Sequence, residues 1–344
     1  MKAIGLFSGG LDSTLAVKMI QDQGIEVIAV KFMGPFFQAP PDGRCRATET
    51  AQKLGMEFRK VPKGEAFVDM LRHPRHGYGS AINPCVDCRI FMLRKAKAMM
   101  EEIGAAFLIT GEVLGQRPMS QRRNMIELIE RESGLEGKIV RPLSAQHFEP
   151  TEAERNGWID RAKLLDIHGR GRRPQIELAA SLGLTEFENP AGGCLLTDKN
   201  FAAKARDLFA HQEQVAMYDF ELLKIGRHFR ADGRKLVCAR DKSECDALNR
   251  RAEAGEGWVL EPVECAGPTV LVQRKMDGSA ETDACDADIL RVAAEMVAAY
   301  SDGASPEVAV KAVSHAGGAE GAQSACVELC VPRVARDAIR AVRV

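Results

Sequence analysis

The chain is organised around the stretch Ser8-Gly9-Gly10-Leu11-Asp12-Ser13. The apolar residues 2–7 come directly before it and are typical of a buried parallel strand. A helical pattern follows it as far as Gly24, a residue that commonly ends a helix. A strand that turns through two glycines into a helix points several backbone N–H groups at one place, where the partial positive charge of the helix N-terminus also acts. The stretch therefore predicts a phosphate-binding loop.

The phosphate loop is not of the Walker type, because no lysine follows its glycines. Its serine, two glycines, aspartate and serine instead resemble the PP-loop of ATP pyrophosphatases, which cleave ATP between the α- and β-phosphates. The alternative is an ordinary Gly-Gly turn whose serine and aspartate cap the helix. Because the six residues come directly after a strand, we favour a nucleotide-binding loop over this alternative. The resemblance implies that Mg²⁺ and ATP bind here, with Asp12 also catalytic, and that the ATP contacts include Ser8, Gly9, Gly10, Leu11, Asp12 and Ser13.

Length and composition indicate an ordinary globular chain of two domains. It has 344 residues, 45% of them apolar and 28% charged, with a net charge of −1. No apolar run reaches the length of a membrane span and no signal peptide precedes the first strand, so we expect no membrane partner and a cytoplasmic location. In that compartment, ten cysteines favour metal or redox chemistry over a disulfide framework.

Strand-like and helix-like patterns alternate through the first 200 residues. We expect strands at residues 2–7, 26–32, 57–61 and 106–110, and helices at 47–54 and 119–132. Such alternation predicts an α/β fold, a doubly wound parallel sheet that binds ligands at the carboxyl ends of its strands. The end of the second strand, at Phe32, would lie beside the phosphate loop, where backbone groups could meet an adenine.

Three cysteines of this first domain are candidates for chemistry. Asn83 and Pro84 fit the N-cap and first position of a helix that continues to about residue 103, which places Cys85 and Cys88 on one face of its first turn. A helix N-terminus stabilises thiolates. Cys194 follows two glycines on a flexible turn, where a packed core cysteine is not expected.

Further motifs resemble the tRNA thiolation enzymes. Thr110-Gly-Glu-Val-Leu-Gly-Gln116, with Ser120-Gln121 and Asn124 behind it, looks most like the 4-thiouridine synthases and implies ATP contacts from Gly111, Gln116 and Gln121. A Cys-x-x-Cys helix with a distant third cysteine resembles the iron–sulfur-dependent tRNA thiolases. By that resemblance, Cys85, Cys88 and Cys194 are catalytic and hold a [4Fe–4S] cluster. The N-terminal THUMP and ferredoxin-like domains usual in 4-thiouridine synthases are absent from this sequence, as is a rhodanese-like domain.

The resemblance implies an ATP-dependent tRNA sulfurtransferase that adenylates a uridine carbonyl oxygen and replaces it with sulfur, giving 4-thiouridine or 2-thiouridine with release of AMP and pyrophosphate. Sulfide or an external donor would supply the sulfur. Besides the cluster, two alternatives stay open at the cysteines: a persulfide on Cys194 that Cys85 or Cys88 resolves, and structural zinc, for which a close fourth ligand is lacking.

The last part of the chain differs in character. A helical pattern extends over residues 201–223, and we expect a linker helix at 201–214. Residues 215–344 are expected to form a smaller α+β domain. Within this domain, we expect Cys326 and Cys330 to be core residues. Its motifs, among them Leu222-Leu-Lys-Ile-Gly-Arg-His-Phe-Arg and Gly267-Pro-Thr-Val-Leu, resemble the NFACT RNA-binding domain. Since Lys and Arg neutralise phosphates, we expect RNA contacts from this domain and from the Gly-rich segment before residue 175, although a solvated basic face is an equal alternative. The RNA-binding candidates are Arg170, Arg172, Arg173, Lys224, Arg227 and Arg230.

Two other functions compete with thiolation. An amidating PP-loop ligase would also split ATP to AMP, but it leaves the three cysteines unexplained. A non-catalytic RNA-binding protein with a retained nucleotide fold is the second, and the intact Ser8, Asp12 and Ser13 argue against it. Oligomeric state, the uridine and the carbonyl that reacts are not determined by the sequence.

Overall fold

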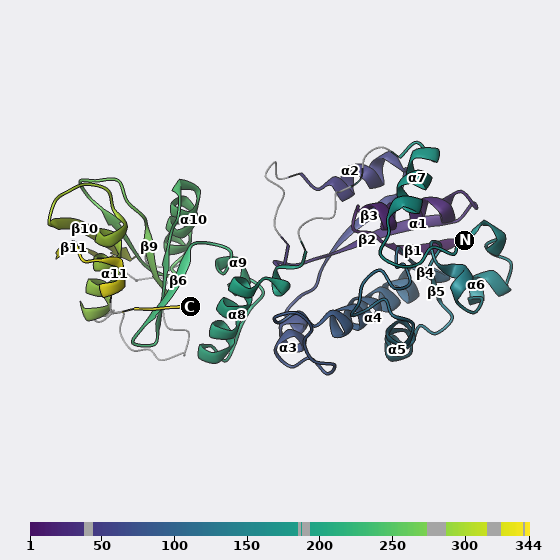
Figure 1. Cartoon of the computed structure of the whole chain (residues 1–344), viewed down its shortest axis with the longest axis horizontal. Helices are drawn as coiled ribbons and strands as arrows, with labels where there is room; N and C mark the ends of the chain where they lie inside the picture. The colour runs from purple at the N-terminus through teal and green to yellow at the C-terminus, as the bar shows by residue number, and fades with distance from the viewer. Residues whose placement is uncertain (38–43, 185–186, 188–192, 274–286, 315–324, 340) are drawn as a thin grey trace. The chain divides into compact units, whose positions relative to one another are not determined.

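The computed structural model describes residues 1–37, 44–184, 187, 193–273, 287–314, 325–339 and 341–344 (Figure 1). The chain divides into two compact units, Met1–Lys199 and Asn200–Val344. Each unit has its own sheet and its own core. Within the described ranges, no helix is both long and apolar enough to cross a membrane.

The first unit is built on a five-stranded sheet in the order β3-β2-β1-β4-β5, with every neighbouring pair parallel. The chain runs outward from β1 to β3 and then crosses to β4 on the other side of β1. The predicted doubly wound α/β fold is thereby confirmed, and the switch point lies between β1 and β4, where such sheets bind ligands. The strands are β1 (Lys2–Leu6), β2 (Glu26–Met33), β3 (Glu57–Pro62), β4 (Phe107–Thr110) and β5 (Ile139–Val140).

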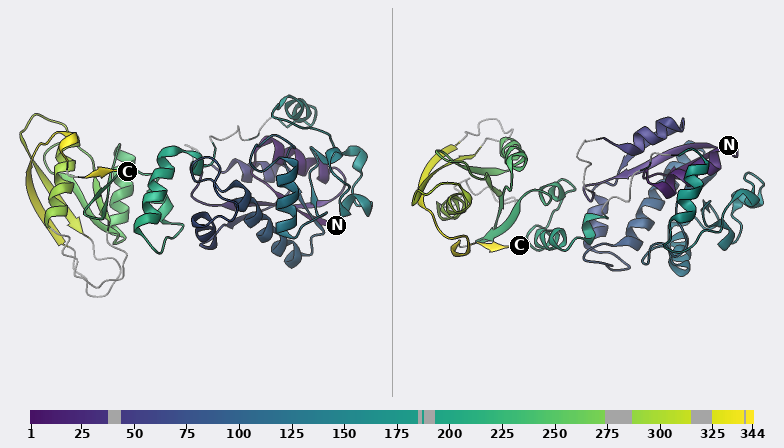
Figure 2. Two further views of the ribbon diagram at one scale, coloured as in Figure 1. Left: turned by 60° about the horizontal axis from the view of Figure 1, so that its bottom comes forward. Right: turned by 45° about the horizontal axis from the view of Figure 1, so that its top comes forward.

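Helices cover both faces of this sheet (Figures 1 and 2). Successive strand residues point to opposite faces, so Ala3 packs in the same cluster as residues of α1 and α2, whereas Ile4 packs in the same cluster as residues of α4 and α5. Both side chains are fully buried, which explains the near-continuous apolar sequence of β1. The helices are α1 (Leu11–Gln21), α2 (Arg46–Lys53), α3 (Ala66–Arg72), α4 (Cys85–Ile103), α5 (Arg123–Ser133), α6 (Glu152–Arg155) and α7 (Arg173–Ser181), with 3₁₀ turns η1 (Ala145–His147), η2 (Arg161–Lys163) and η3 (Leu195–Thr197).

Two helix starts differ from the prediction. Helix α5 begins at Arg123, not at residue 119, because the preceding loop closes on itself through backbone bonds from Gly115 N to Gln121 O and from Gln121 N to Arg117 O. The N-cap of α4 is Pro84, not Asn83, and its side chain makes no capping bond.

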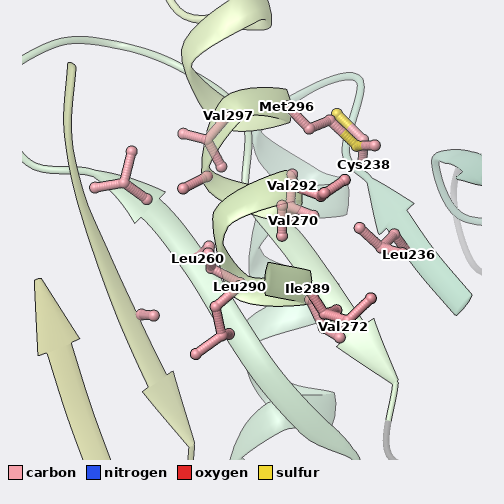
Figure 3. Close-up of a cluster of buried hydrophobic side chains, with 14 of the residues drawn as sticks. Leu236, Cys238, Leu260, Val270, Val272, Ile289, Leu290, Val292, Met296 and Val297 are labelled. Atoms are coloured by element: carbon pink, nitrogen blue, oxygen red, sulfur yellow. The ribbon is translucent and has the colours of Figure 1, made fainter. Parts of the chain in front are cut away.

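The second unit is built on a seven-stranded antiparallel sheet in the order β11-β10-β8-β9-β7-β6-β12. Helix α11 lies across one face, and Figure 3 shows its Ile289, Val292 and Met296 packed against Leu236 and Val272 of the sheet. This sheet and its helices give the smaller α+β domain that the sequence predicted. Its elements are α8 (Lys199–His211), α9 (Asp219–Leu222), β6 (Arg227–Ala231), β7 (Arg234–Cys238), α10 (Lys242–Glu253), β8 (Gly257–Pro262), β9 (Val270–Gln273), α11 (Ala287–Tyr300), β10 (Glu307–Ser314), β11 (Ala325–Pro332), η4 (Arg336–Ala338) and β12 (Val342–Arg343).

Two expectations for this unit are wrong. The helical pattern over 201–223 is not one helix, since α8 ends at His211 and the short α9 starts only at Asp219. Cys326 and Cys330 are exposed and not in the core, because they lie on the face of the edge strand β11 opposite to Leu329 and Val331, which pack in the core cluster around α11. An edge strand lacks a neighbour on one side, so an apolar sequence does not ensure burial there.

Candidate functional site

The phosphate loop (residues 8–13) joins β1 to α1. Gly9 has φ +84°, and a Cβ there would lie 2.7 Å from the Cα of Ala47 in α2, so only glycine fits. The loop holds its own shape: the Ser13 hydroxyl donates to the Gly10 carbonyl at 2.9 Å and lies 3.1 Å from the Ser8 hydroxyl. The turn is therefore preformed at the end of β1, as the sequence predicted.

The loop after β4 (residues 111–121) meets the phosphate loop across the switch point. A Cβ on Gly111 would lie 2.6 Å from the backbone carbon of Asp12, so the two backbones touch. The Gln116 side-chain amide donates to Asp12 Oδ2 at 3.3 Å. Gln121 is buried in the same loop. The structure thus brings together the ATP contacts predicted on these two loops, although it does not test whether they bind ATP.

Two other predicted ATP contacts face the interior. Leu11 packs with Leu15 and Ala179 beneath the phosphate loop. Phe32 is buried with Val86 under β2. Their side chains support the loop from within, and a contact to ATP from either residue stays a prediction for its backbone.

The basic segment before α7 reaches the same place. Gly169 N donates to Leu114 O at 2.7 Å, which docks the segment on the loop after β4. Arg172 then lies with its guanidinium 4.0 Å from Asp12 Oδ2, whereas Arg170 and Arg173 are not placed against this carboxylate. Of the three arginines predicted to bind RNA here, Arg172 therefore faces the phosphate loop.

The environment of Asp12 is partly desolvated. Burial raises the pKa of its carboxyl above the ordinary value, and Arg172, Gln116 and Arg117 act in the opposite direction. Oδ1 of this carboxylate has no hydrogen-bond partner in the described part of the chain. A desolvated carboxylate with a free oxygen is suited to binding a hard cation such as Mg²⁺.

The three predicted cysteines gather at a second site, the cysteine site (Cys85, Cys88 and Cys194). Backbone bonds from Ile82 N to Leu196 O and from Leu195 N to Phe36 O dock the segment of Cys194 next to the start of α4. Burial and the neighbouring Cys88 and Cys85 raise the pKa of the Cys194 thiol to about 11. The segments that carry the three cysteines are therefore docked together in the first unit.

The expected thiolate stabilisation by the helix N-terminus is wrong for Cys85. Burial and the nearby Cys88 raise the pKa of its thiol, and these effects exceed the opposing ones of Arg117 and Asn83. At this thiol, burial therefore has the largest influence and favours the protonated form.

Lys63 is a site residue that the sequence did not reveal. It follows β3 and is 3% exposed, with its ammonium 3.6 Å from Cys88 Sγ and 4.2 Å from the centroid of the Phe67 ring. The ammonium is suited to offset negative charge on sulfur. In the sequence, Lys63 is marked only by its position at the carboxyl end of a predicted strand. Many lysines have such a position, so it does not identify a site residue.

Glu112 is a second residue that the sequence analysis did not assign. Although burial opposes it, the guanidinium groups of Arg89 and Arg141 lower the pKa of this carboxyl to about 2. Arg89 Nε donates to it at 2.8 Å and Arg141 Nε at 3.0 Å. Since Arg89 follows Cys88 on α4, this buried network joins the cysteine helix to the loop after β4.

The phosphate loop and the cysteine site share a neighbour. The positive charge of Arg117 lowers the pKa values of both Asp12 and Cys85, against the larger effect of burial on each. One guanidinium therefore lies within electrostatic range of both sites, at the same edge of the sheet.

Soft thiolates are the ligands that iron and zinc prefer, so the chemistry of the cysteine site fits such a metal. Throughout the described residues, however, no three His, Cys, Asp or Glu side chains lie at metal-coordinating spacing, and this includes the three cysteines. Metal ligation by Cys85, Cys88 and Cys194 stays a prediction.

In the second unit, the predicted RNA-binding residues have internal partners. Arg230 forms a two-pronged ion pair with Asp207, with both N–O distances 2.9 Å. Lys224 pairs with Glu221 at 2.7 Å, and Arg227 stacks over Tyr300. The ion pair with Asp207 shows that Arg230 contributes to the packing of this unit. RNA binding by Lys224, Arg227 and Arg230 stays a prediction.

Comparisons with known proteins agree with this division of the chain. Residues 1–149 match the family described as Thiamine biosynthesis protein (ThiI), and residues 226–326 match the NFACT protein RNA binding domain. A probable tRNA sulfurtransferase of Thermococcus kodakarensis is 28% identical over 153 residues, which cover 41% of this chain and 36% of that protein. The tRNA-specific 2-thiouridylase MnmA 3 of Bacteroides fragilis is 31% identical over 108 residues, or 30% of this chain and 28% of that one.

Among solved structures, a 4-thiouridine synthetase–RNA complex with bound ATP is 20% identical, with a TM-score of 0.39, over 65% of this chain and 52% of that one. The chain spans about a third of the length of the curated relatives above. The two family matches cover separate domains, one in each part of the sequence. The first part of the chain is therefore similar to the ThiI family and to part of a probable tRNA sulfurtransferase, and the second part is similar to the NFACT RNA-binding domain.

Proposed function

We propose that this protein is an ATP-dependent tRNA sulfurtransferase, which adenylates a uridine carbonyl oxygen and replaces it with sulfur. The observation that carries the proposal is that one domain holds both sites: Gln116 donates to Asp12 at the phosphate loop, and the bond from Ile82 N to Leu196 O docks the Cys194 segment beside the start of α4. Activation by ATP and delivery of sulfur can then occur on one bound nucleotide base.

The phosphate loop would perform the activation. Backbone N–H groups at the start of α1 and the hydroxyls of Ser8 and Ser13 are suited to bind the β- and γ-phosphates, and Asp12 to bind the accompanying Mg²⁺. The carbonyl oxygen of the base attacks the α-phosphorus, the bond from that phosphorus to the bridging oxygen breaks, and pyrophosphate leaves with the electron pair. The adenylated carbonyl is now a good leaving group.

The cysteine site would deliver the sulfur. In the persulfide route, a sulfane-sulfur donor such as a low-molecular-weight persulfide first transfers its outer sulfur to the thiolate of Cys194. The terminal sulfur on Cys194 then attacks the activated carbon, and AMP leaves with the electron pair of the broken carbon–oxygen bond. Cys85 or Cys88 attacks the Cys194 sulfur, which breaks the bond to the transferred sulfur, leaves that sulfur on the uridine and forms a disulfide. A thiol reductant then restores the two cysteines. In the cluster route, a [4Fe–4S] cluster on the three cysteines would present sulfide. In either route, the ammonium of Lys63 would offset the charge beside Cys88.

The second unit would bind the tRNA. Its match to an RNA-binding domain supports this, and so do Lys224 and Arg227 with their positive charges. The matches to the curated relatives above span only about a third of the length of those proteins. The proposed RNA binding by the second unit therefore rests on the residues of this chain and not on those relatives.

The test is thiolation by the full chain, purified without oxygen and incubated with tRNA and MgATP, in one reaction with sulfide and in another with a low-molecular-weight persulfide and a thiol reductant. The digested nucleosides are then analysed by mass spectrometry. We expect 4-thiouridine or 2-thiouridine, and its loss in Cys194→Ser and Cys88→Ser. The control Cys330→Ser alters an exposed cysteine of β11 and should retain activity. Absence of thiolated uridine with the unaltered protein would contradict the proposal.

Iron analysis of the same sample separates the two sulfur routes. Bound iron and acid-labile sulfide in equal amounts, lost together in Cys85→Ser, would favour the cluster. Iron-free protein that remains active, with a sulfur adduct on Cys194, would favour the persulfide.

A further inference from the structure

Unpaired polar atoms gather on one side of the phosphate loop. Asp12 Oδ1, Arg172 Nε and both amide atoms of Gln175 are buried and make no hydrogen bond to any described residue. Gln175 is fully buried, in the first turn of the nine-residue helix α7. A buried polar group without a hydrogen-bond partner is unfavourable, so proteins rarely hold several of them together without a ligand.

These side chains face one another. Arg172 Nη2 lies 4.0 Å from Asp12 Oδ2, and the Gln175 amide is near enough to the same carboxylate to lower its pKa. Packing fixes this arrangement, because Leu11 and Leu15 of α1 share a buried cluster with Ala179 of α7. The unpaired atoms are therefore held in position and do not result from a loose surface.

The unpaired groups include both donors and acceptors. The carboxylate oxygen of Asp12 and the amide oxygen of Gln175 are hard ligands, which suit Mg²⁺ or its bound water. The guanidinium of Arg172 offers N–H groups in the planar arrangement that binds phosphate oxygens. A ligand that carries both a divalent cation and phosphates would satisfy all of them.

We propose that Arg172 and Gln175 complete the nucleotide site and hold the magnesium pyrophosphate part of ATP against Asp12. This inference rests on the proposed function and deepens it. Arg172 would neutralise the charge that develops on pyrophosphate as its bond to the α-phosphorus breaks, and Gln175 would orient the cation. By this assignment Arg172 binds the nucleotide and not the RNA.

Calorimetric binding to the full chain tests Arg172, with MgATP, magnesium pyrophosphate and AMP as separate ligands. A hydrogen bond to a charged group is worth about 1.5–3 kcal/mol, so Arg172→Gln should weaken MgATP and pyrophosphate binding roughly 10- to 100-fold. Binding of AMP, which lacks the β- and γ-phosphates, should change less than about twofold. The control Lys163→Gln removes an exposed positive charge of η2 and should leave all three affinities unchanged.

Thermal melting tests Gln175 with a readout that separates a ligand-binding role from a structural one. Gln175→Met keeps the side-chain length but removes the two unpaired polar atoms. The ligand-free variant should melt at the same temperature as the unaltered protein or above it, while the stabilisation by MgATP becomes smaller. A structural glutamine would give the opposite pattern, with a lower melting temperature and an unchanged MgATP effect, and would overturn the proposal.

The outcomes distinguish this inference from the proposed function. If the unaltered protein binds MgATP and Arg172→Gln binds it equally well, the inference is wrong and the proposed function stands. If AMP binding falls together with MgATP binding in a folded Arg172→Gln variant, the assignment to pyrophosphate is wrong. If the unaltered protein binds no adenine nucleotide, the proposed function itself is contradicted, and this inference with it.

Discussion

At the residue scale, the thiols of the first unit differ in their readiness to react. Burial and two neighbouring cysteines raise the pKa of Cys194 to about 11, so at neutral pH it is almost entirely a protonated thiol. For Cys45 burial acts in the same direction, but contacts with Thr48 and the charges of Lys31 and Lys60 outweigh it and lower the pKa.

We therefore predict that iodoacetamide alkylates Cys45 of the ligand-free protein faster than Cys194 at pH 8. Mass spectrometry of the tryptic peptides at successive times measures both rates. Alkylation of Cys194 at a rate equal to that of Cys45 would contradict the raised pKa of Cys194, and denatured protein, in which both react alike, is the control.

The buried carboxyl of Glu112 gives a second prediction at this scale. Glu112→Gln removes the buried carboxylate that Arg89 and Arg141 share, although Arg141 keeps its ion pair with Glu130. Since breaking a buried pair costs about 3–5 kcal/mol, we expect a loss of unfolding free energy near the lower end of that range. Urea unfolding measures this loss. The control Glu177→Gln removes one partner of an exposed i,i+4 pair and should cost less than about 0.5 kcal/mol.

The same carboxyl predicts a pH dependence. The pKa of Glu112 is about 2 in the folded chain and 4.5 when unperturbed, so its stabilising effect is complete above pH 4.5 and is lost as the pH falls toward 2. Unfolding free energies of the unaltered protein should fall more steeply over that window than those of Glu112→Gln. Parallel curves for the two proteins would show that Glu112 does not carry this effect.

Sequence reasoning identified only some of these residues. Asp12 and Cys88 stand in short local motifs, so their neighbours along the chain reveal them. Lys63 and Gln175 stand in no such motif, because packing between distant segments brings Lys63 near Cys88 and Gln175 near Asp12. Tertiary contact of this kind leaves no local pattern in a single sequence.

At the element scale, the proposed nucleotide site depends on the close contact of two loops at the switch point. Gly111→Ala would place a Cβ 2.6 Å from the backbone of Asp12, where no flexible side chain can move aside. We expect the phosphate loop to be displaced and MgATP binding to weaken at least about tenfold, the effect of losing one charge-assisted contact.

Gly171→Ala is the matched control, since a Cβ there would meet no atom within 4 Å and the residue does not have a positive φ. Calorimetry on both variants decides between a specific contact and a general loss of flexibility. Equal affinities in Gly111→Ala and the unaltered protein would show that the two loops do not form one site.

Helix α8 and strand β6 provide a test in the second unit. Arg230 and Lys235 both pair with the same Asp207, and Lys235 is nearly fully buried. Arg230→Gln should lower the unfolding free energy by about 1–3 kcal/mol, because a partly buried charge loses a two-pronged partner. The exposed Lys242→Gln, measured by the same urea titration, should have almost no effect.

RNA binding by Arg230→Gln, measured under conditions in which the variant is folded, then reports on the predicted RNA contact. A large loss of affinity without loss of stability would assign Arg230 to RNA binding and not to the fold.

Elements were predicted best where their apolar period is strong. The four strands that we expected in the first unit lie within a few residues of their expected bounds. The predicted helix over 119–132 began too early because the turn that closes on Gln121 depends on backbone bonds across the loop. The exposure of Cys326 and Cys330 follows from which face of β11 packs in the core cluster around α11, and that is a property of the whole sheet.

At the scale of the whole molecule, two domain types that the comparisons match separately occur in one chain. The proposed nucleotide site lies in the part that is similar to the ThiI family, and the second part is similar to an RNA-binding domain. The central claim is that the oxygen activated by ATP is a carbonyl oxygen of the RNA.

Transfer of labelled oxygen tests that claim most directly. A tRNA transcribed with ¹⁸O at both uracil carbonyls is thiolated with MgATP and sulfide, and the AMP is analysed by mass spectrometry. We predict that AMP gains one ¹⁸O for each uridine that acquires sulfur. AMP that contains only unlabelled oxygen, formed while sulfur enters the tRNA, would contradict adenylation of the carbonyl and with it the proposed order of activation and sulfur transfer.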